Sequence, residues 1–218
     1  MQQVFSAALQ YLLHVPTGDA AAAGDPLPVI LFLHGSGERG DDPQLVKKYG
    51  LPRELESRPD FPFVVVSPQC PEDVRWTELP GSIIAVLETV LSRTHADRSR
   101  IYLTGFSMGG QGAWRLAVRH PDTFAAIAPV SGKIPPAPDF LERLCGIAAL
   151  PVWAAHGDAD TVVPYETTQT MVERLRACGG NDVRFTLYPG LDHGPTADAF
   201  YQGDALADWF LTHQRSLP

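Results

Sequence analysis

Short apolar runs alternate along the chain with amphipathic segments. The apolar runs cover residues 29–33, 63–66, 101–103, 124–128, 152–155 and 183–188, and each ends at Gly, Pro or a polar residue. Continuous apolar runs of this length are typical of strands that are buried on both faces of a parallel sheet. The segment 9–15 is predicted to be an antiparallel strand at the edge of that sheet.

Helical periodicity appears between these runs. Residues 82–94 place five apolar side chains at i, i+3, i+4, i+7 and i+8, which forms one stripe on a helix: Ile83, Val86, Leu87, Val90 and Leu91. Further helices are predicted for 110–120, for 164–176 and for 204–213, and Pro164 is well suited to a first helical turn. Alternating strands and helices predict an α/β fold with a central, mostly parallel sheet flanked by helices.

The remaining segments are short, so we expect a single domain over residues 1–218. Residues 17–28 are rich in Ala, Gly, Asp and Pro and are interpreted as a surface turn before the first core strand. The Pro-rich stretch 131–150 is too short for a large lid. The longer segment 37–62 is expected to form part of the rim of a site.

Composition and charge exclude several classes of function. The 218 residues carry 17 Lys and Arg against 25 Asp and Glu, a formal charge of −8, and the basic residues are scattered. Nucleic-acid binding is therefore not expected. The longest apolar runs are too short for a transmembrane helix. The first 16 residues lack a basic region before their apolar part, so we interpret them as part of the fold rather than as a signal peptide.

The chain has three cysteines, Cys70, Cys145 and Cys178. A small and odd number of cysteines argues against a disulfide framework. None has the spacing of metal ligands. We expect free thiols in a reducing compartment, which predicts a cytoplasmic protein without a metal.

A nucleophile motif lies between a predicted strand and a predicted helix. Gly105-Phe106-Ser107-Met108-Gly109 matches Gly-x-Ser-x-Gly, in which a tight strand-to-helix turn lifts the serine above the carboxyl end of the sheet. The helix N-terminus favours negative charge at the same point. The motif and its context predict Ser107 as a catalytic nucleophile of the α/β-hydrolase fold.

Partners for this serine follow in the order that the fold uses, first an acid and then a histidine. The loop after the run 152–155 offers two aspartates, Asp158 and Asp160, and we favour Asp160 as the residue facing the histidine. Asp158 is interpreted as a residue that shapes the loop. His193 follows the last strand and precedes the final helices, so we predict it as the general base.

Acyl transfer also needs two backbone N–H groups directed at the oxyanion. One is predicted at Met108, directly after the nucleophile, and the other at Ser36 in the Leu33-His34-Gly35-Ser36-Gly37 turn. The glycines there, Gly35 included, allow backbone and substrate to approach closely. His34 is expected to be a structural, hydrogen-bonding residue.

With these motifs the chain resembles compact bacterial carboxylesterases of the α/β-hydrolase superfamily, which are related to dienelactone hydrolases and feruloyl esterases. The resemblance covers nearly the whole chain and rests on LPVILFLHGSGERGDD, VVSPQCPEDVRW, RIYLTGFSMGGQGAW, PVWAAHGDADTVVP and YPGLDHGPTADAFY. It implies hydrolysis of small acyl esters through an acyl-enzyme, with no cofactor and a small-molecule ester as the substrate.

The resemblance also implies that Pro68-Gln69-Cys70-Pro71 and Trp76 lie near the site. Gln69, Trp76 and Gly35 are expected to bind the substrate, with Trp76 as a wall of the pocket. The chain departs from many relatives after His193, where it reads Gly194-Pro195-Thr196. The specific substrate therefore stays open between short-chain esters, feruloyl or acetyl-sugar esters, acyl thioesters and small peptides. A non-catalytic binding protein on the same scaffold, and a homodimer, are alternatives that the sequence leaves open.

Overall fold

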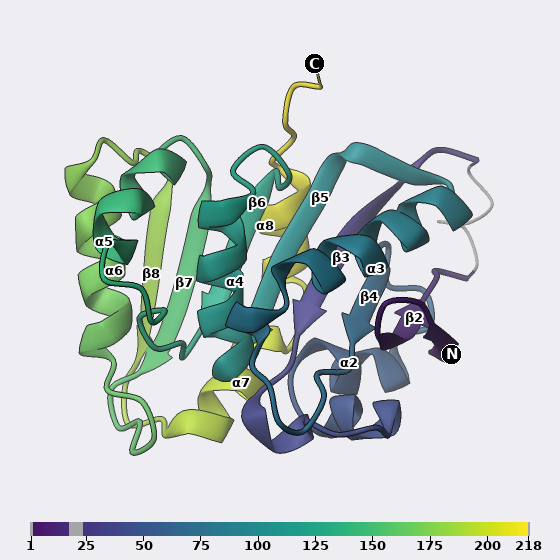
Figure 1. Ribbon diagram of the computed structural model, residues 1–218, viewed down its shortest axis with the longest axis horizontal. Coiled ribbons are helices and arrows are strands. Elements are labelled where there is room, and N and C mark those ends of the chain that lie inside the picture. Colours follow the sequence, from purple (N-terminus) through teal and green to yellow (C-terminus); the bar gives the residue numbers. More distant parts are fainter. Residues whose placement is uncertain (1, 18–23, 218) are drawn as a thin grey trace.

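The computed structural model describes residues 2–17 and 24–217, and its centre is one eight-stranded sheet (Figure 1). The strand order is β1-β2-β4-β3-β5-β6-β7-β8. Strands β1 and β2 pair antiparallel, β2 pairs antiparallel with β4, and all other pairs are parallel. The carboxyl ends of the parallel strands therefore lie together, along the lower edge of the sheet in Figure 1.

Six strands correspond to the predicted apolar runs and two lie at the N-terminus. Their bounds are β1 Gln3–Ser6, β2 Gln10–His14, β3 Leu27–Leu33, β4 Val64–Pro68, β5 Ala96–Phe106, β6 Ala126–Val130, β7 Val152–Gly157 and β8 Val183–Tyr188. The α-helices are α2 Leu51–Glu54, α3 Pro80–Arg93, α4 Met108–Arg119, α5 Phe140–Arg143, α6 Glu166–Ala177, α7 His193–Tyr201 and α8 Ala205–Leu211. Short 3₁₀ turns are η1 Ser36–Glu38, η2 Pro43–Lys48, η3 Leu55–Ser57, η4 Trp76–Glu78 and η5 Leu144–Ile147.

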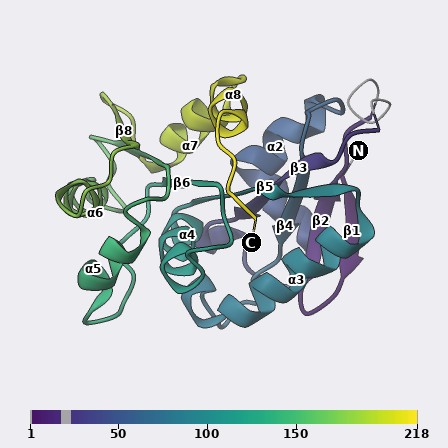
Figure 2. The same cartoon turned by 90° about the horizontal axis from the view of Figure 1, so that it is seen from above.

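Two hydrophobic clusters cover the two faces of the sheet (Figure 2). Helices α3, α4, α5 and α6 pack on one face, and α7, α8 and the segment from η2 to η3 pack on the other. Alternate residues of a central strand enter opposite clusters, as Leu31 and Phe32 of β3 do. Burial on both faces explains why these strands are continuous apolar runs. The predicted fold class, a central and mostly parallel sheet flanked by helices, is confirmed, and the described part of the chain contains no large lid.

The strand predicted at 9–15 forms as β2 and is antiparallel, but it is not at the edge. The short strand β1 pairs with its outer side, through Val4 opposite Leu12. Only four residues make up β1, and they lack the apolar run that marked the core strands. Of the predicted surface turn 17–28, residues 18–23 lie outside the described residues, and Leu27 and Pro28 already belong to β3.

The expectation of three free thiols is wrong for two of them. Cys145 and Cys178 form a disulfide with a Cα–Cα distance of 5.3 Å, whereas Cys70 is a free, buried cysteine. The two bonded residues are 33 positions apart, in η5 and just after α6. Their pairing depends on the packing of α6 beside η5, which spacing in the sequence does not reveal.

Candidate active site

Ser107 stands at the sharp turn between β5 and α4, in the middle of the sheet. Its φ of 58° and ψ of −116° place a non-glycine residue in the left-handed half of the Ramachandran plot. A Cβ at Gly105 would lie 2.5 Å from the Gly109 carbonyl oxygen, and a Cβ at Gly109 only 1.7 Å from that of Leu33. The two motif glycines are therefore required by close backbone contacts that hold the strained turn.

A chain of hydrogen bonds joins Ser107 to the two residues predicted as its partners. The Ser107 hydroxyl lies 2.8 Å from Nε2 of His193, and Nδ1 of His193 lies 2.6 Å from Oδ2 of Asp160. The side chain of Asp160 is fully buried and that of His193 is 14% exposed. The carboxylate can only accept from Nδ1–H, which leaves Nε2 free to accept the serine proton.

Asp160 is held by several donors that the motif did not reveal. Its Oδ1 accepts from the backbone N–H groups of Val162 and Val163, at 2.9 and 2.8 Å. Its Oδ2 also lies 3.1 Å from Nε2 of His156, a fully buried histidine whose Nδ1 contacts the Thr168 hydroxyl at 2.8 Å. Burial lowers the pKa of His156, so a neutral ring faces the carboxylate. His156 directly follows the predicted strand 152–155, but no motif in the sequence marked it as a support for Asp160.

The two other aspartates of this region connect loops. Asp158 accepts from the backbone N–H of Gly190 at 2.6 Å, which ties the loop after β7 to the loop after β8. Asp192 caps α7 and accepts from the N–H groups of His193 and Thr161 at 2.7 and 2.8 Å. These N–H groups lower the pKa of Asp192. Asp158 is thus a loop-shaping residue, as expected, and Asp192 is a contact between the acid and histidine loops that sequence reasoning missed.

Ser36 and Met108, the predicted oxyanion donors, line the same pocket as Ser107. Met108 is the first residue of α4, so its N–H has no acceptor within the helix. Ser36 begins η1 directly after Gly35. A Cβ at Gly35 would be 3.6 Å from Cβ of Ser107 and 2.8 Å from Oε2 of Glu38, so a larger residue would crowd this turn.

Trp76 is not a wall of the pocket, and this prediction is wrong. It is 1% exposed, packs in the core beside α4, and donates its indole N–H to the His34 carbonyl at 2.8 Å. Gln69 is also buried and donates its side-chain amide to the Glu38 carbonyl. Both side chains hold the turn that contains Ser36 from behind instead of reaching into the pocket. Residue type alone did not distinguish a supporting position from a lining one.

The pocket at Ser107 has a volume of about 240 Å³. Besides Ser36, Ser107 and Met108, it is lined by Gln111, Val162 and Val163 and by three cationic residues, Arg39, Arg75 and Lys133. Arg39 comes from the segment 37–62, which was expected to contribute to the rim. Tyr49 of the same segment packs on Phe106, whose ring in turn packs on His193 with centroids 4.7 Å apart.

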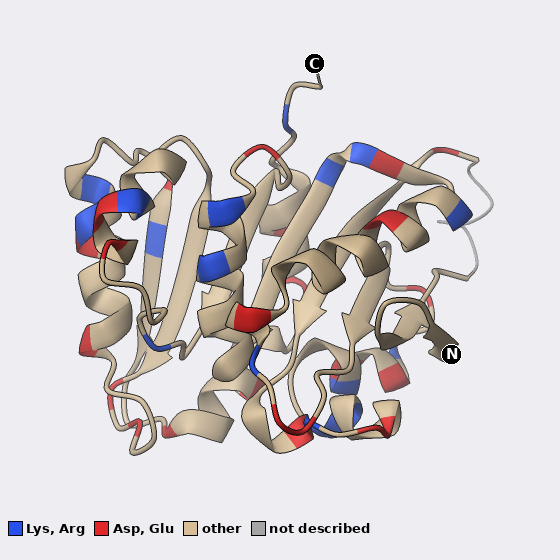
Figure 3. Cartoon of the chain, in the orientation of Figure 1, with Lys and Arg blue, Asp and Glu red and all other residues tan. Residues whose placement is uncertain are grey.

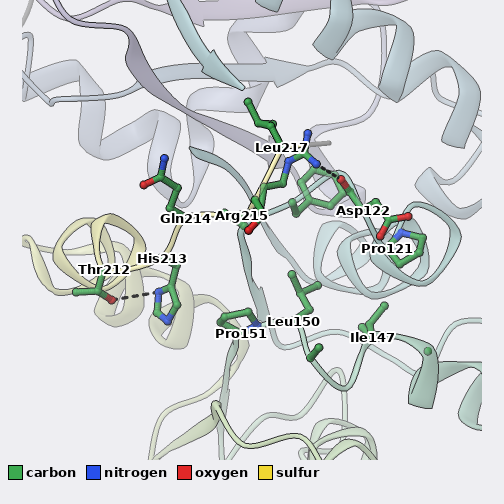
Figure 4. Close-up of a pocket in the computed structure, with 15 residues that line it drawn as sticks. Pro121, Asp122, Ile147, Leu150, Pro151, Thr212, His213, Gln214, Arg215 and Leu217 are labelled. Atoms are coloured by element: carbon green, nitrogen blue, oxygen red, sulfur yellow. Dashed lines mark hydrogen bonds between the residues drawn. The ribbon is translucent and has the colours of Figure 1, made fainter. Parts of the chain in front are cut away.

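A larger cavity of about 940 Å³ lies elsewhere, and Figure 4 shows its lining. It is bounded by the C-terminal tail, which Arg215 ties to the Asp122 carbonyl, and by Ile147, Leu150 and Pro151. Pro151 directly precedes β7, so this cavity is at the amino end of that strand, whereas ligands of parallel sheets bind at the carboxyl ends. Ser107 is not part of it, and we place the candidate site at the smaller pocket.

Within residues 2–17 and 24–217, no group of three or more His, Cys, Asp or Glu side chains is arranged to hold a metal ion. No helix in these ranges has both the length and the apolar character needed to span a bilayer.

The sheet order, the strained turn after β5, the position of Asp160 after β7 and that of His193 at the start of α7 together define an α/β-hydrolase. A family model described as Phospholipase/Carboxylesterase matches residues 61–202, and the chain belongs to that family.

Relatives agree with this assignment. Mouse lysophospholipase-like protein 1 (Mus musculus) is 28% identical over 94% of this chain and 95% of its own length. A Nocardia uniformis subsp. tsuyamanensis relative that is named as an esterase, NocK, is 28% identical over 87% of this chain, which spans only 55% of that protein. The crystal structure of a thermostable esterase superposes with a TM-score of 0.82 at 28% identity, over 99% of this chain and 63% of the other.

Proposed function

We propose that the chain is a serine carboxylesterase that hydrolyses small, short-chain acyl esters through an acyl-enzyme. The observation that carries this proposal is the unbroken path of hydrogen bonds from the Ser107 hydroxyl through His193 to the buried carboxylate of Asp160. The family membership and the esterase relatives support the reaction class.

His193 is the proton carrier in this mechanism. Its Nε2 takes the proton of Ser107 as Oγ attacks the ester carbonyl, and the same nitrogen then protonates the leaving alcohol. Water attacks the acyl-enzyme with His193 again as the base, which releases the acid and restores the serine. Asp160 fixes the tautomer and stabilises the imidazolium, and the backbone N–H groups of Ser36 and Met108 stabilise the oxyanion.

The size of the pocket supports short acyl chains. A volume of about 240 Å³ lies below the usual range for drug-sized ligands, roughly 300–1,000 Å³, and no large lid covers it in the described part of the chain. The absence of long apolar walls beside Ser107 among the described residues also argues against long-chain fatty esters, since only two valines and a methionine supply apolar lining.

The first experiment compares hydrolysis of p-nitrophenyl acetate, butyrate, octanoate and palmitate by the wild type and by Ser107→Ala. We expect turnover to fall with chain length and to drop by about 10⁴-fold or more in the variant, because removal of the nucleophile leaves only binding and the oxyanion hole. Full activity in Ser107→Ala would remove the proposal.

The two aspartates of one loop provide a matched pair. Asp160→Asn should lower kcat on p-nitrophenyl acetate by about 10³- to 10⁴-fold, because the amide no longer fixes the correct tautomer of His193. Asp158→Asn changes a carboxylate that contacts only the neighbouring loop, so its loss should stay below about tenfold. The reverse order would reassign the acid.

Labelling with a fluorophosphonate probe distinguishes an esterase from a non-catalytic binding protein on this scaffold. Labelling that disappears in Ser107→Ala requires an activated serine. If the wild type is not labelled and hydrolyses no ester, the result favours the binding-protein alternative.

One domain over residues 1–218, a cytoplasmic location and a homodimer stay predictions. The Cys145–Cys178 disulfide weighs against the cytoplasm, because disulfides persist mainly in oxidising compartments.

A further inference from the structure

Cationic side chains are concentrated around Ser107. Of the pocket residues that the structure describes, Arg39, Arg75 and Lys133 are basic and none is acidic. The chain as a whole has the opposite balance, with 17 basic against 25 acidic residues, and Figure 3 shows the two signs interspersed over its helices and loops. The charged residues that line the pocket therefore have the opposite sign to the net charge of the chain.

These cations reach the pocket from both sides of the nucleophile. Arg39 and Arg75 follow β3 and β4, on one side of β5, and Lys133 follows β6 on the other side. A group bound between them lies directly over the carboxyl end of β5, where Ser107 is. An anion that these side chains bind would therefore lie close to the ester carbonyl that reacts with Ser107.

Arg39 is oriented by backbone contacts and carries no ion pair with any described residue. Its Nε donates to the Ser36 carbonyl at 3.1 Å, and its Nη1 donates to the Glu72 carbonyl at 2.6 Å.

None of the three pocket cations, Arg39, Arg75 and Lys133, has a carboxylate of a described residue within 4.0 Å. Other arginines do, for example Arg98 with Glu88 and Arg100 with Asp97. The pocket cations are thus left available for a ligand.

We propose that the esters preferred by this site carry an anionic group, a carboxylate or a phosphate, within a few bonds of the scissile carbonyl, and that Arg39, Arg75 and Lys133 bind it. This inference rests on the proposed esterase function and deepens it. Guanidinium and ammonium groups are the side chains that bind such anions, and a field of one sign in a cleft raises the local concentration of the opposite charge.

The test compares esters that differ only in charge. For the acyl side these are p-nitrophenyl hydrogen adipate and its neutral methyl ester, and for the alcohol side 4-acetoxybenzoate and its methyl ester. We expect kcat/KM to be about tenfold higher for the charged member of at least one pair at low ionic strength, mainly through a lower KM. The preference should shrink strongly at about 0.5 M salt, where the Debye length is only a few ångströms.

Single substitutions locate the effect. Arg39→Met, Arg75→Met and Lys133→Met should each reduce the ratio of charged to neutral kcat/KM by about three- to fivefold. Arg75→Lys should retain most of it. Arg93→Met is the matched control, because Arg93 lies in the last turn of α3 and lines a different pocket, beside β1 and β2. Which pair responds tells whether the anion belongs to the acid or to the alcohol.

Equal kcat/KM for charged and neutral esters, or ratios that the three variants leave unchanged, would overturn the inference. If neutral esters are hydrolysed with dependence on Ser107 but no charge preference appears, the esterase function stands and this inference fails alone. If no ester is hydrolysed but the fluorophosphonate labels Ser107, protection by adipate or inorganic phosphate tests the cations directly, and no protection overturns the inference. If the protein shows neither ester hydrolysis nor labelling of Ser107, both proposals are contradicted.

Discussion

His34 is a histidine that the fold keeps neutral beside the candidate site. It is 1% exposed, and its Nδ1–H donates to the Gly35 carbonyl at 2.6 Å while its Nε2 accepts from the Cys70 N–H at 2.9 Å. A proton on Nε2 would face another N–H group. Burial, assisted by the charge of Arg39, lowers the pKa of His34 to about 4.

This shift makes stability depend on pH. The unfolded chain binds a proton on His34 below pH 6.5 and the folded chain only below about pH 4, so the free energy of unfolding falls as the pH drops through this window. His34 alone accounts for about 3 kcal/mol of that fall. Denaturant unfolding at pH 7, 5.5 and 4.5 should show a steeper loss in the wild type than in His34→Gln. Parallel pH profiles would contradict the assignment.

Glu38 acts in the opposite direction and must be measured beside it. Its buried carboxyl lies 3.9 Å from the His34 ring, and burial raises its pKa. A raised pKa means that stability decreases as the pH rises above 4.5, so Glu38→Gln should remove a loss of stability that begins at about this pH. The two variants therefore change the profile with opposite signs.

At the scale of residues, the sequence predicted the members of the hydrogen-bonded chain at the candidate site more reliably than the residues that support them. Ser107 and His193 lie at the start of helices α4 and α7 and Asp160 lies in the loop after β7, each with motif context, and hydrogen bonds join the three side chains. Trp76 was placed in the pocket, whereas its indole supports the His34 carbonyl from the core. His156 and Asp192 were missed, because their contacts join loops distant in the sequence and leave no local pattern.

Helix α4 illustrates how the site depends on the packing of an element. Gly112 lies one turn into this helix, where a Cβ would be 2.6 Å from Cβ of Trp76 and 3.1 Å from Cδ1 of Leu33. The absence of a side chain lets the helix approach β3 and η4 closely. The N-terminus of α4, with Met108, is thereby held against the turn that contains Ser36.

Two glycines within helices should respond in opposite ways to substitution by alanine. Gly112→Ala overpacks a rigid contact and should lower the free energy of unfolding by about 1–3 kcal/mol. Gly81 lies in the first turn of α3, where an added Cβ would meet no atom of the described residues within 4 Å. Gly81→Ala should therefore raise the free energy of unfolding by about 0.5–1 kcal/mol. Denaturant titrations of both variants against the wild type measure the difference, and equal effects would show that the contact with Trp76 does not limit α4.

The positions of most elements could be predicted from periodicity. The stripe from Ile83 to Leu91 is the buried face of α3. The run 183–188 is strand β8 to the residue, but β8 is the last strand of the sheet and only Val183 is buried in it, so the expected burial on both faces is wrong for this strand. The edge of the sheet was misjudged because β1 has a polar, mostly exposed pattern that resembles a loop. Edge strands are defined by what pairs with them, and a single sequence does not contain that information.

At the scale of the molecule, the alternation of strands and helices was sufficient for the fold class, since parallel strands with crossover helices have few arrangements. The strand order around β5, which brings the loops after β3, β5, β7 and β8 to one edge, was not predicted from the sequence. The disulfide lay beyond sequence reasoning. It closes a loop that contains β7, Asp160 and α6, and so it links the segment that carries Asp160 to the packing of η5.

Reduction of this disulfide should destabilise the molecule by about 2–4 kcal/mol, because the unfolded chain gains the entropy of a loop of 33 residues. A reductant should therefore lower the denaturant midpoint of the wild type. The double variant Cys145→Ser/Cys178→Ser should have a low midpoint without reductant, and the reductant should not change it. Cys70→Ser is the control, since Cys70 is a free, buried thiol and its loss should leave the response to reductant intact.

Counting thiols completes this test and bears on the compartment. Denatured, unreduced protein should take up one alkylating group, on Cys70, and three after reduction. Uptake of three alkylating groups before reduction, in protein isolated under conditions that trap thiols, would mean that Cys145 and Cys178 are reduced in the cell, as the cytoplasmic prediction requires. Uptake of one group would mean that the protein folds in an oxidising environment. The loop that carries Asp160 would then owe part of its stability to that environment.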